Sequence, residues 1–258
     1  MALLKFAKVP RSTYYYYVKK ITSKDKYKQI KEEITSIYHE NKGRYGYRRI
    51  TMELHNRGYI INHKTVSKLM KQLVLQCFVR MKKYKSYKGE QGKICDNILN
   101  REFKSDKPNE KWVTDVTEFK LFGTKIYLSP IVDLFNGEVI SYNISDRPAF
   151  SQVMDMIDTA FGKIPHGANL ILHSDQGWQY QMKQYQAKLK EKGIVQSMSR
   201  KGNCYDNSLA ENFFGLLKSE LLYIQQFESV EHFKKELIDY IDYYNNKRIK
   251  GKLNRNLL

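Results

Sequence analysis

The chain has 258 residues, a formal net charge of +18 and 41% hydrophobic residues. This length and apolar content suit one large domain or two modest ones and exclude a disordered chain. No stretch approaches the eighteen or more apolar residues of a membrane span, and the first residues lack the pattern of a signal peptide, so we expect a cytoplasmic protein with no membrane partner.

The positive charge is concentrated in the N-terminal part of the chain. Residues 1–110 contain 26 Lys and Arg against 10 Asp and Glu, whereas residues 111–258 contain 19 against 17. A basic half of this kind suits contact with a phosphate backbone, because each neutralised phosphate releases condensed counterions. A lysine-rich surface with no nucleic-acid role is the alternative. The three cysteines, Cys77, Cys95 and Cys204, are far apart and predict neither disulfides nor a zinc site.

Apolar residues recur at helical spacing between residues 30 and 75, in three segments separated by glycine-containing breaks. Asn62 is expected to cap the third helix. Three short helices in this order resemble a helix-turn-helix unit, and Lys64, Lys68 and Lys71 on the last of them are predicted to contact DNA. Any small helical bundle would show the same apolar stripes, so a purely structural interpretation competes with this one.

The stretch 80–97 is basic and aromatic, which predicts a linker or an arm along nucleic acid, and we place a domain boundary near residue 105. Beyond it, turn signals at Gly123 and at Asn136-Gly137 predict three strands joined by hairpins. Further elements are predicted as a helix near 151–161, a strand at 169–173, a helix at 180–193, a strand at 194–199 and a C-terminal helix. This order predicts a mixed α/β sheet covered by helices.

Three carboxylates occupy positions where a buried charge is costly. Asp115 lies on the predicted strand in "WVTDVTEF", Asp175 follows the apolar run "NLILH", and Glu211 lies on an amphipathic helix. Buried together they would repel, and hard divalent ions such as Mg²⁺ would resolve that repulsion because they prefer oxygen ligands. Taken singly, each has a plain structural explanation: an edge-strand carboxylate, a turn former, and a capping box formed by "SLAE" with Ser208.

The spacing of these carboxylates is more specific. With 59 residues between the first two and 35 between the last two, they look like the catalytic domain of retroviral integrases and many transposases. The stretches "KWVTDVTEF", "LHSDQGWQYQ", "QSMSRKGNCYDNSLAENFFGLLKSE" and "YIDYYNNKRIK" closely resemble the second-frame transposase of insertion-sequence family three. The segments "STYYYYVKK" and "GRYGYRRI" resemble that family's N-terminal region, so the resemblance covers almost the whole chain.

The resemblance implies a ribonuclease-H-like mixed sheet with flanking helices, preceded by a small basic helix-turn-helix-like domain. It implies metal-dependent DNA cleavage and 3′-hydroxyl strand transfer in insertion-sequence transposition, with Asp115, Asp175 and Glu211 as catalytic metal ligands. Two Mg²⁺ or Mn²⁺ ions about 3.5 to 4 Å apart would bridge the scissile phosphate. The implied partners are DNA, as terminal inverted repeats and as target, a first-frame transposition protein or a fusion with it, and further copies of the chain assembled on DNA. The implied location is the bacterial cytoplasm, in association with the nucleoid.

Several further residues fall within the resembling stretches. Lys218 lies seven residues after the glutamate, close to the same helix face, and a basic residue at this place contacts DNA in relatives, so it is predicted to hold substrate phosphate. A solvated helix lysine is the alternative. Asp206 and Asn207 are expected to shape the loop before the catalytic glutamate. His173 fits either the site or the core, and Trp178 fits either packing or DNA contact.

The resemblance divides the chain into a helical DNA-binding-like region (1–79), a basic linker (80–105), an integrase-type catalytic core (106–250) and a divergent or truncated tail (251–258). Relatives continue differently after "NNKRIK". That departure leaves open a catalytically impaired DNA-binding remnant. A ribonuclease-H-type nuclease acting on hybrids is the other alternative, and the basic helical half and the 35-residue interval argue against it.

Overall fold

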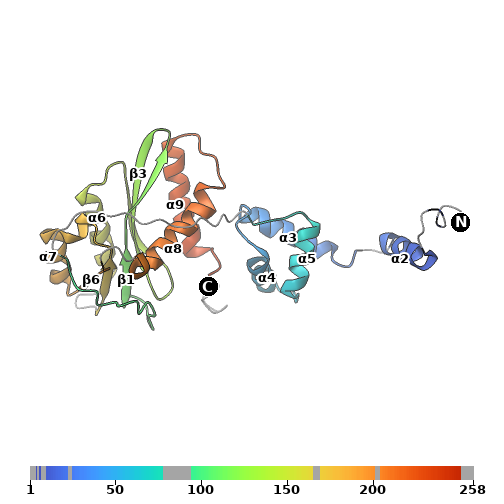
Figure 1. Cartoon of the computed structure of the whole chain (residues 1–258), viewed down its shortest axis with the longest axis horizontal. Coiled ribbons are helices and arrows are strands. Elements are labelled where there is room, and N and C mark those ends of the chain that lie inside the picture. The colour runs from blue at the N-terminus through green and yellow to red at the C-terminus, as the bar shows by residue number, and fades with distance from the viewer. Residues whose placement is uncertain are drawn as a thin grey trace. The chain divides into compact units, whose positions relative to one another are not determined.

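The computed structural model describes residues 4, 6, 10–22, 25–77, 94–164, 169–200 and 204–250. It divides into two compact units, residues 1–77 and 78–258, and Figure 1 labels many of their elements. The first part of the predicted linker, 80–93, and the tail, 251–258, lie outside the described residues, so the boundaries given above stay predictions. Within the described segments, no helix has both the length and the apolar character needed to cross a membrane.

The N-terminal unit contains the three helices that the apolar spacing predicts. Its helices are α2 (Arg11–Thr22), α3 (Lys28–Glu40), α4 (Tyr47–Asn56) and α5 (His63–Gln72). Ile37, Leu54 and Val66, one from each of the last three helices, are fully buried, which confirms the predicted faces. The Oδ1 atom of Asn62 accepts a hydrogen bond of 2.8 Å from the amide of Lys64, so the predicted cap is confirmed as well.

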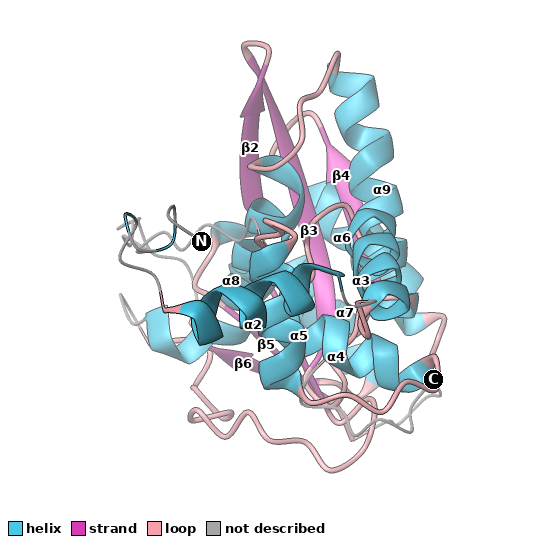
Figure 2. Cartoon of the chain, turned by 90° about the vertical axis from the view of Figure 1, so that its right-hand side faces the viewer, coloured by secondary structure: helices cyan, strands magenta, loops and turns pink. Residues whose placement is uncertain are grey.

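The second unit is built on one mixed sheet, as predicted. Its strands are β1 (Lys111–Thr114), β2 (Thr117–Leu121), β3 (Thr124–Asp133), β4 (Val139–Ser145), β5 (Ile171–Ser174) and β6 (Val195–Met198). They lie in the order β4, β3, β1, β5, β6, with β2 continuing the line of β1 along β3. β3 pairs antiparallel with β1, β2 and β4, whereas β5 pairs parallel with β1 and β6. The β2–β3 hairpin forms the long arm of the sheet in Figure 2.

The structure corrects the placement of Asp115 inside a strand. β1 and β2 share one register along β3 but are interrupted at Asp115 and Val116. In that register Asp115 falls opposite Pro130, which has no N–H to donate to the ladder. Leu134, four residues after Pro130, donates its N–H to the carbonyl of Lys111 on β1. Because every second N–H of a strand points to the same side, an N–H at position 130 would also point toward this neighbouring strand. The proline therefore accounts for the break that frees Asp115 from the sheet.

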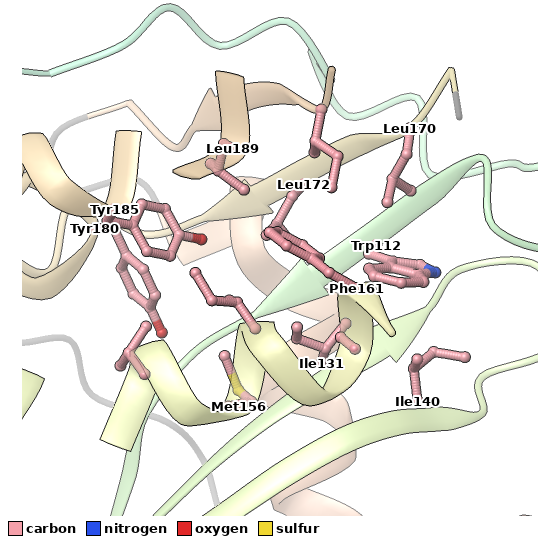
Figure 3. Packing of buried hydrophobic residues seen from close by; sticks show 14 of the residues in the cluster. Trp112, Ile131, Ile140, Met156, Phe161, Leu170, Leu172, Tyr180, Tyr185 and Leu189 are labelled. Carbon is pink, nitrogen blue, oxygen red and sulfur yellow. The ribbon is translucent and has the colours of Figure 1, made fainter. Parts of the chain in front are cut away.

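Helices cover both faces of the sheet, with α6 and α7 on one face and α8 and α9 on the other (Figure 1). These helices are α6 (Phe150–Phe161), α7 (Lys183–Lys192), α8 (Ser208–Leu217) and α9 (Val230–Asn246), with 3₁₀ turns η1 (Trp178–Gln181) and η2 (Cys204–Asn207) and a π-helical turn η3 (Lys218–Leu222). Trp112 points into the core beneath α6, where Figure 3 shows it with Met156 and Tyr180. Its neighbour Val113 points into the opposite core, as alternation along a strand requires.

One predicted helix is shorter in the structure. The sequence predicts helix throughout 180–193, but this stretch contains the end of η1, a break at Met182 and then α7. Gly193 ends α7 with a φ of 74°, the left-handed conformation that glycine adopts without strain. η1 begins three residues after Asp175, and the carbonyl of Tyr180 in η1 accepts a hydrogen bond of 2.8 Å from the side chain of Gln196 on β6.

Candidate active site

The parallel pairing of β1 and β5 brings two of the predicted carboxylates together at the C-terminal ends of these neighbouring strands. Val113 on β1 is paired with His173 on β5. Asp115 and Asp175 each follow that pair by two residues, and because the strands are parallel both leave the sheet at the same end. The sheet register therefore places these two side chains beside each other, although they are far apart in the sequence.

A tight turn orients the carboxylate of Asp175. Its Oδ1 atom accepts a hydrogen bond of 2.8 Å from the amide of Gly177. A Cβ atom at position 177 would lie 2.9 Å from that oxygen and 2.9 Å from the Oε1 atom of Gln179. The absence of a side chain at Gly177 is thus a steric requirement of the Asp175 position. The side-chain amide of Gln176 donates to the carbonyl of Ser199 at 2.9 Å and ties the turn to the chain beyond β6.

Negatively charged side chains gather at the C-terminal ends of β1 and β5. Burial raises the pKa of Asp115 well above its usual value, and the charges of Asp175 and Glu211 raise it further, whereas the amide of Val116 and the ammonium of Lys218 oppose the rise. The Val116 amide donates to the Oδ1 atom of Asp115 at 2.7 Å. Burial also raises the pKa of Asp175, and the Gly177 N–H opposes that rise. Several carboxylates in one poorly solvated place favour a bound cation or a proton.

Glu211 reaches the same region from α8, which contacts β1. The capping box that the sequence suggests would place Ser208 at the cap of this helix. In the structure α8 begins at Ser208, Asn207 occupies the cap position, and the Asn207 side chain accepts no capping hydrogen bond. Glu211 lies in the first turn, half-buried, where its charge acts on Asp115.

Lys218 lies within electrostatic reach of Asp115, and its backbone, with φ −63° and ψ −39°, continues α8, so the seven-residue helical spacing from Glu211 is kept. α8 ends at Leu217, and Lys218 is the first residue of the π-helical turn η3. Its ammonium nitrogen lies 5.7 Å from the ring centroid of Phe119. Burial lowers the pKa of Lys218, while the charge of Asp115 acts to raise it. A partly desolvated lysine beside carboxylates is suited to binding a phosphate that enters the site.

The π-helical turn is held in place by a buried ion pair. Glu220 accepts hydrogen bonds from Nε and Nη2 of Arg248 at 2.9 and 2.8 Å, and a third from the hydroxyl of Tyr240 at 3.1 Å. Glu220 and Arg248 are both buried. The stretch "NNKRIK" therefore has a structural function, because its arginine anchors the turn that carries Lys218.

The donor chemistry at this edge fits a hard divalent cation. All three predicted ligands offer carboxylate oxygens. Burial first, and then the charges of Asp175 and Glu211, raise the pKa of Asp115, and a bound cation would offset both effects. Among the residues that the structure describes, no three His, Cys, Asp or Glu side chains are close enough together to hold a metal ion. The site has the charge and the ligand type for a metal, and the charges of Asp175 and Glu211 both act on Asp115.

The two remaining aromatic candidates, His173 and Trp178, differ in burial. His173 is fully buried between Ser197 and Ser199, and burial lowers its pKa to about 4, so it is a neutral core histidine. Trp178 lies against Phe150, with ring centroids 6.5 Å apart, and is 49% exposed, so it packs on one side and faces solvent elsewhere.

The three lysines predicted to contact DNA belong to the other unit. Lys64, Lys68 and Lys71 are all exposed on α5, as that contact would require.

Sequence reasoning missed two residues, one beneath the carboxylates and one bonded to the turn before Glu211. Tyr180 is buried beneath them, and burial and then the charges of Asp115 and Asp175 raise its pKa. Arg101, in the predicted linker, forms an ion pair with Asp206 at 2.8 Å. The alternation of polar and aromatic residues in "WQYQ" is a weak signal for the first, and we find no sequence signal for the second.

Comparison with known protein families agrees with this arrangement. An "Integrase core domain" family matches residues 105–204, a second family of the same description matches residues 211–254, and an "HTH-like domain" family matches residues 25–83. The first two matches contain the three carboxylates, and the third contains α3 to α5.

Similar proteins are transposases of insertion sequences. The putative transposase InsK of element IS150 from Escherichia coli K12 is 54% identical over 97% of this chain and 89% of its own length. The transposase of IS904 from Lactococcus lactis is 38% identical over 85% of this chain and 88% of its own, and InsF of IS3A from Escherichia coli K12 is 31% identical over 93% and 85%. Among solved structures, the HTLV-2 integrase catalytic core in complex with magnesium is 20% identical, with a TM-score of 0.45 over 57% of this chain and 93% of its own.

Proposed function

Because the chain belongs to the second-frame transposases of insertion-sequence family three, we propose that Asp115, Asp175 and Glu211 are its catalytic carboxylates. The protein is a transposase with an integrase core on a ribonuclease-H-like fold, and it acts in DNA transposition and integration. Membership in this class implies a requirement for divalent metal and binding of DNA. The residue assignments, the number of ions and the partners are our proposal.

The residues divide the chemistry among them. Asp115 and Asp175, at the ends of parallel strands, and Glu211, from α8, supply oxygen ligands for two Mg²⁺ or Mn²⁺ ions. Such ions, when bound, activate the attacking oxygen and stabilise the leaving oxygen of a phosphodiester. Lys218 binds the non-reacting oxygens of the same phosphate and keeps its phosphorus beside the carboxylates. The nucleophiles are water and then a DNA 3′-hydroxyl, so no side chain forms a covalent intermediate.

This proposal is supported by one observation. Asp115 and Asp175 follow two paired parallel strands at the same end, and the charge of Glu211 acts on Asp115. The test is joining of DNA ends with free 3′-hydroxyls to a plasmid in Mg²⁺. Asp175→Asn should abolish joining and leave DNA binding intact, whereas Asp146→Asn, at an exposed surface ion pair, should change neither. Joining by Asp175→Asn at the normal rate would refute the assignment.

Two alternatives give different results in the same experiment. Wild-type protein that binds the terminal repeats but never joins them would be a DNA-binding remnant. Cleavage of RNA–DNA hybrids without joining would indicate a ribonuclease-H-type nuclease.

The terminal inverted repeats are proposed to contact α5 of the N-terminal unit. Lys64, Lys68 and Lys71 are exposed on this helix, and each phosphate that a lysine no longer neutralises should reduce the slope of log affinity against log salt by about 0.9. Replacing each by Met should show this reduction, while Lys28→Met on α3 serves as the control. An unchanged slope for all three would remove α5 from the DNA interface. Assembly into a homo-oligomer on DNA, a first-frame partner or fusion, and a nucleoid location complete the proposal.

A further inference from the structure

The segment 94–103, ahead of β1, is attached along the sheet edge formed by β6. The Oγ atom of Ser197 accepts hydrogen bonds from the amides of Ile98 and Leu99 at 3.0 and 3.1 Å. The amide of Met198 donates to the carbonyl of Asp96 at 3.2 Å. Leu99 is only 2% exposed. Residues 94–103, which the sequence assigns to a linker, are therefore a packed part of the second unit, and we call them the clasp.

One branch of hydrogen bonds leads from the clasp to Asp175. Because the Oγ atom of Ser197 accepts two amide protons, its own proton is donated to Nδ1 of His173 at 2.8 Å. This leaves the proton of the neutral imidazole on Nε2, which faces the Oγ atom of Ser199 at 3.3 Å. The Ser199 hydroxyl donates in turn to the carbonyl of Ser174 at 3.2 Å. The branch ends at the residue immediately before Asp175.

A second branch leads from the clasp toward Glu211. The buried carboxylate of Asp206 accepts from Nε of Arg101 at 2.8 Å, from Nδ2 of Asn97 at 2.9 Å and from the amide of Arg200 at 3.0 Å. Burial alone would raise the pKa of Asp206, but the bond from Arg101 and that from Arg200 hold it below its usual value. Asp206 lies in η2, which leads directly into α8 and Glu211. The clasp thus holds the turn from which the helix of Glu211 begins.

We propose that the clasp sets the spacing between the catalytic carboxylates, with Arg101 and Asp206 as positioning residues that touch neither metal nor DNA. This inference rests on the proposed function of Asp175 and Glu211. Its physical basis is that two carboxylates from different elements must meet at one metal centre, and that a misplacement of about 1 Å costs about a hundredfold in rate. The clasp is bonded to the chain beside both of them.

The test compares Arg101→Met and Asp206→Asn with Arg101→Lys. The Arg101 side chain is 48% exposed, so its loss opens no cavity, and Arg101→Lys keeps the charge beside Asp206. The matched control is Lys234→Met, which removes the surface ion pair with Asp146. Four quantities are measured on the full chain: Mn²⁺ binding by calorimetry, joining rate at saturating DNA, KM for DNA and thermal unfolding midpoint.

We expect Arg101→Met and Asp206→Asn to weaken Mn²⁺ binding about tenfold and to lower the joining rate by about ten- to a hundredfold. KM for DNA should match that of Lys234→Met, the loss of joining should exceed what a lowered unfolding midpoint accounts for at the assay temperature, and Arg101→Lys should recover most of the loss. Ser197→Ala interrupts the other branch and should weaken Mn²⁺ binding independently of Arg101.

Normal Mn²⁺ binding and joining in Arg101→Met and Asp206→Asn would overturn the proposal. The proposal would also be overturned if the loss of Mn²⁺ binding and joining followed the lowering of the unfolding midpoint in every variant, since the clasp would then contribute only to stability. If the wild-type protein binds no Mn²⁺, the proposed function is refuted, and the role of the clasp with it. If the wild-type protein binds Mn²⁺ and joins DNA, and the variants do so equally well, only the role of the clasp is refuted.

Discussion

The substitution Gly177→Ala tests the site with a single methyl group. The backbone of Gly177 has φ −58° and ψ 141°, which alanine adopts without strain, so the effect is steric. The new Cβ would lie 2.9 Å from the Oδ1 atom of Asp175 and 3.3 Å from Cδ2 of Tyr180. Ordinary contact starts at 3.4 Å, so the Asp175 carboxylate has to move by about half an ångström. Because a displacement of about 1 Å costs about a hundredfold, we expect joining to fall about tenfold, or about 1.4 kcal/mol in the barrier.

Stability should change little in this variant. Replacing glycine by alanine where the backbone permits it stabilises by about 0.4 to 1 kcal/mol through the unfolded chain, which offsets part of the steric cost. Joining of DNA ends in Mg²⁺ and the urea midpoint are therefore measured together. The matched control is Gly215→Ala on α8, where a Cβ meets nothing within 4 Å. Gly177→Ala with normal joining, or Gly215→Ala with an equal loss, would refute the reasoning.

Three further predictions concern stability. Arg248→Met leaves the buried Glu220 without its cation and should lower the free energy of unfolding by about 3 to 5 kcal/mol in urea; a loss below about 1 kcal/mol would contradict the buried pair. Burial lowers the pKa of Lys250 to about 8, and Arg248 adds to that effect, so the unfolded chain binds this proton more tightly. Stability should accordingly rise between about pH 8 and 10.5, by at most about 3 kcal/mol, and Lys250→Met should lack this rise. Asp175→Asn removes a charge that raises the pKa of Asp115, so the metal-free protein should gain about 1 to 2 kcal/mol at neutral pH. That gain should vanish below about pH 4, where Asp115 is protonated in both states, and a variant less stable than wild type at pH 7 would contradict the repulsion.

The elements that the sequence predicted well are specified by neighbours along the chain. The three N-terminal helices follow from apolar spacing, and the cap at Asn62 follows from one side chain and the amide two residues later. The hairpin at Gly123, with a φ of 74°, follows from the conformational freedom of glycine. The identity of Asp115 and Asp175 as candidate ligands came from motif spacing, which needs no tertiary information.

The kinds of element and the candidate chemistry are therefore specified locally along the chain, whereas the way distant segments meet depends on the folded arrangement. Asp115 leaves its strand because Pro130 faces it across the sheet, and this pairing exists only once the register of β1 and β3 is set. Arg248 anchors the turn of Lys218 through a buried ion pair, and the partly exposed Arg101 bonds the buried Asp206 in the turn before Glu211. Both pairs join residues that are far apart in the chain. Such contacts have no local signature, because a charged residue shows the same sequence pattern on a solvated face as in a buried pair.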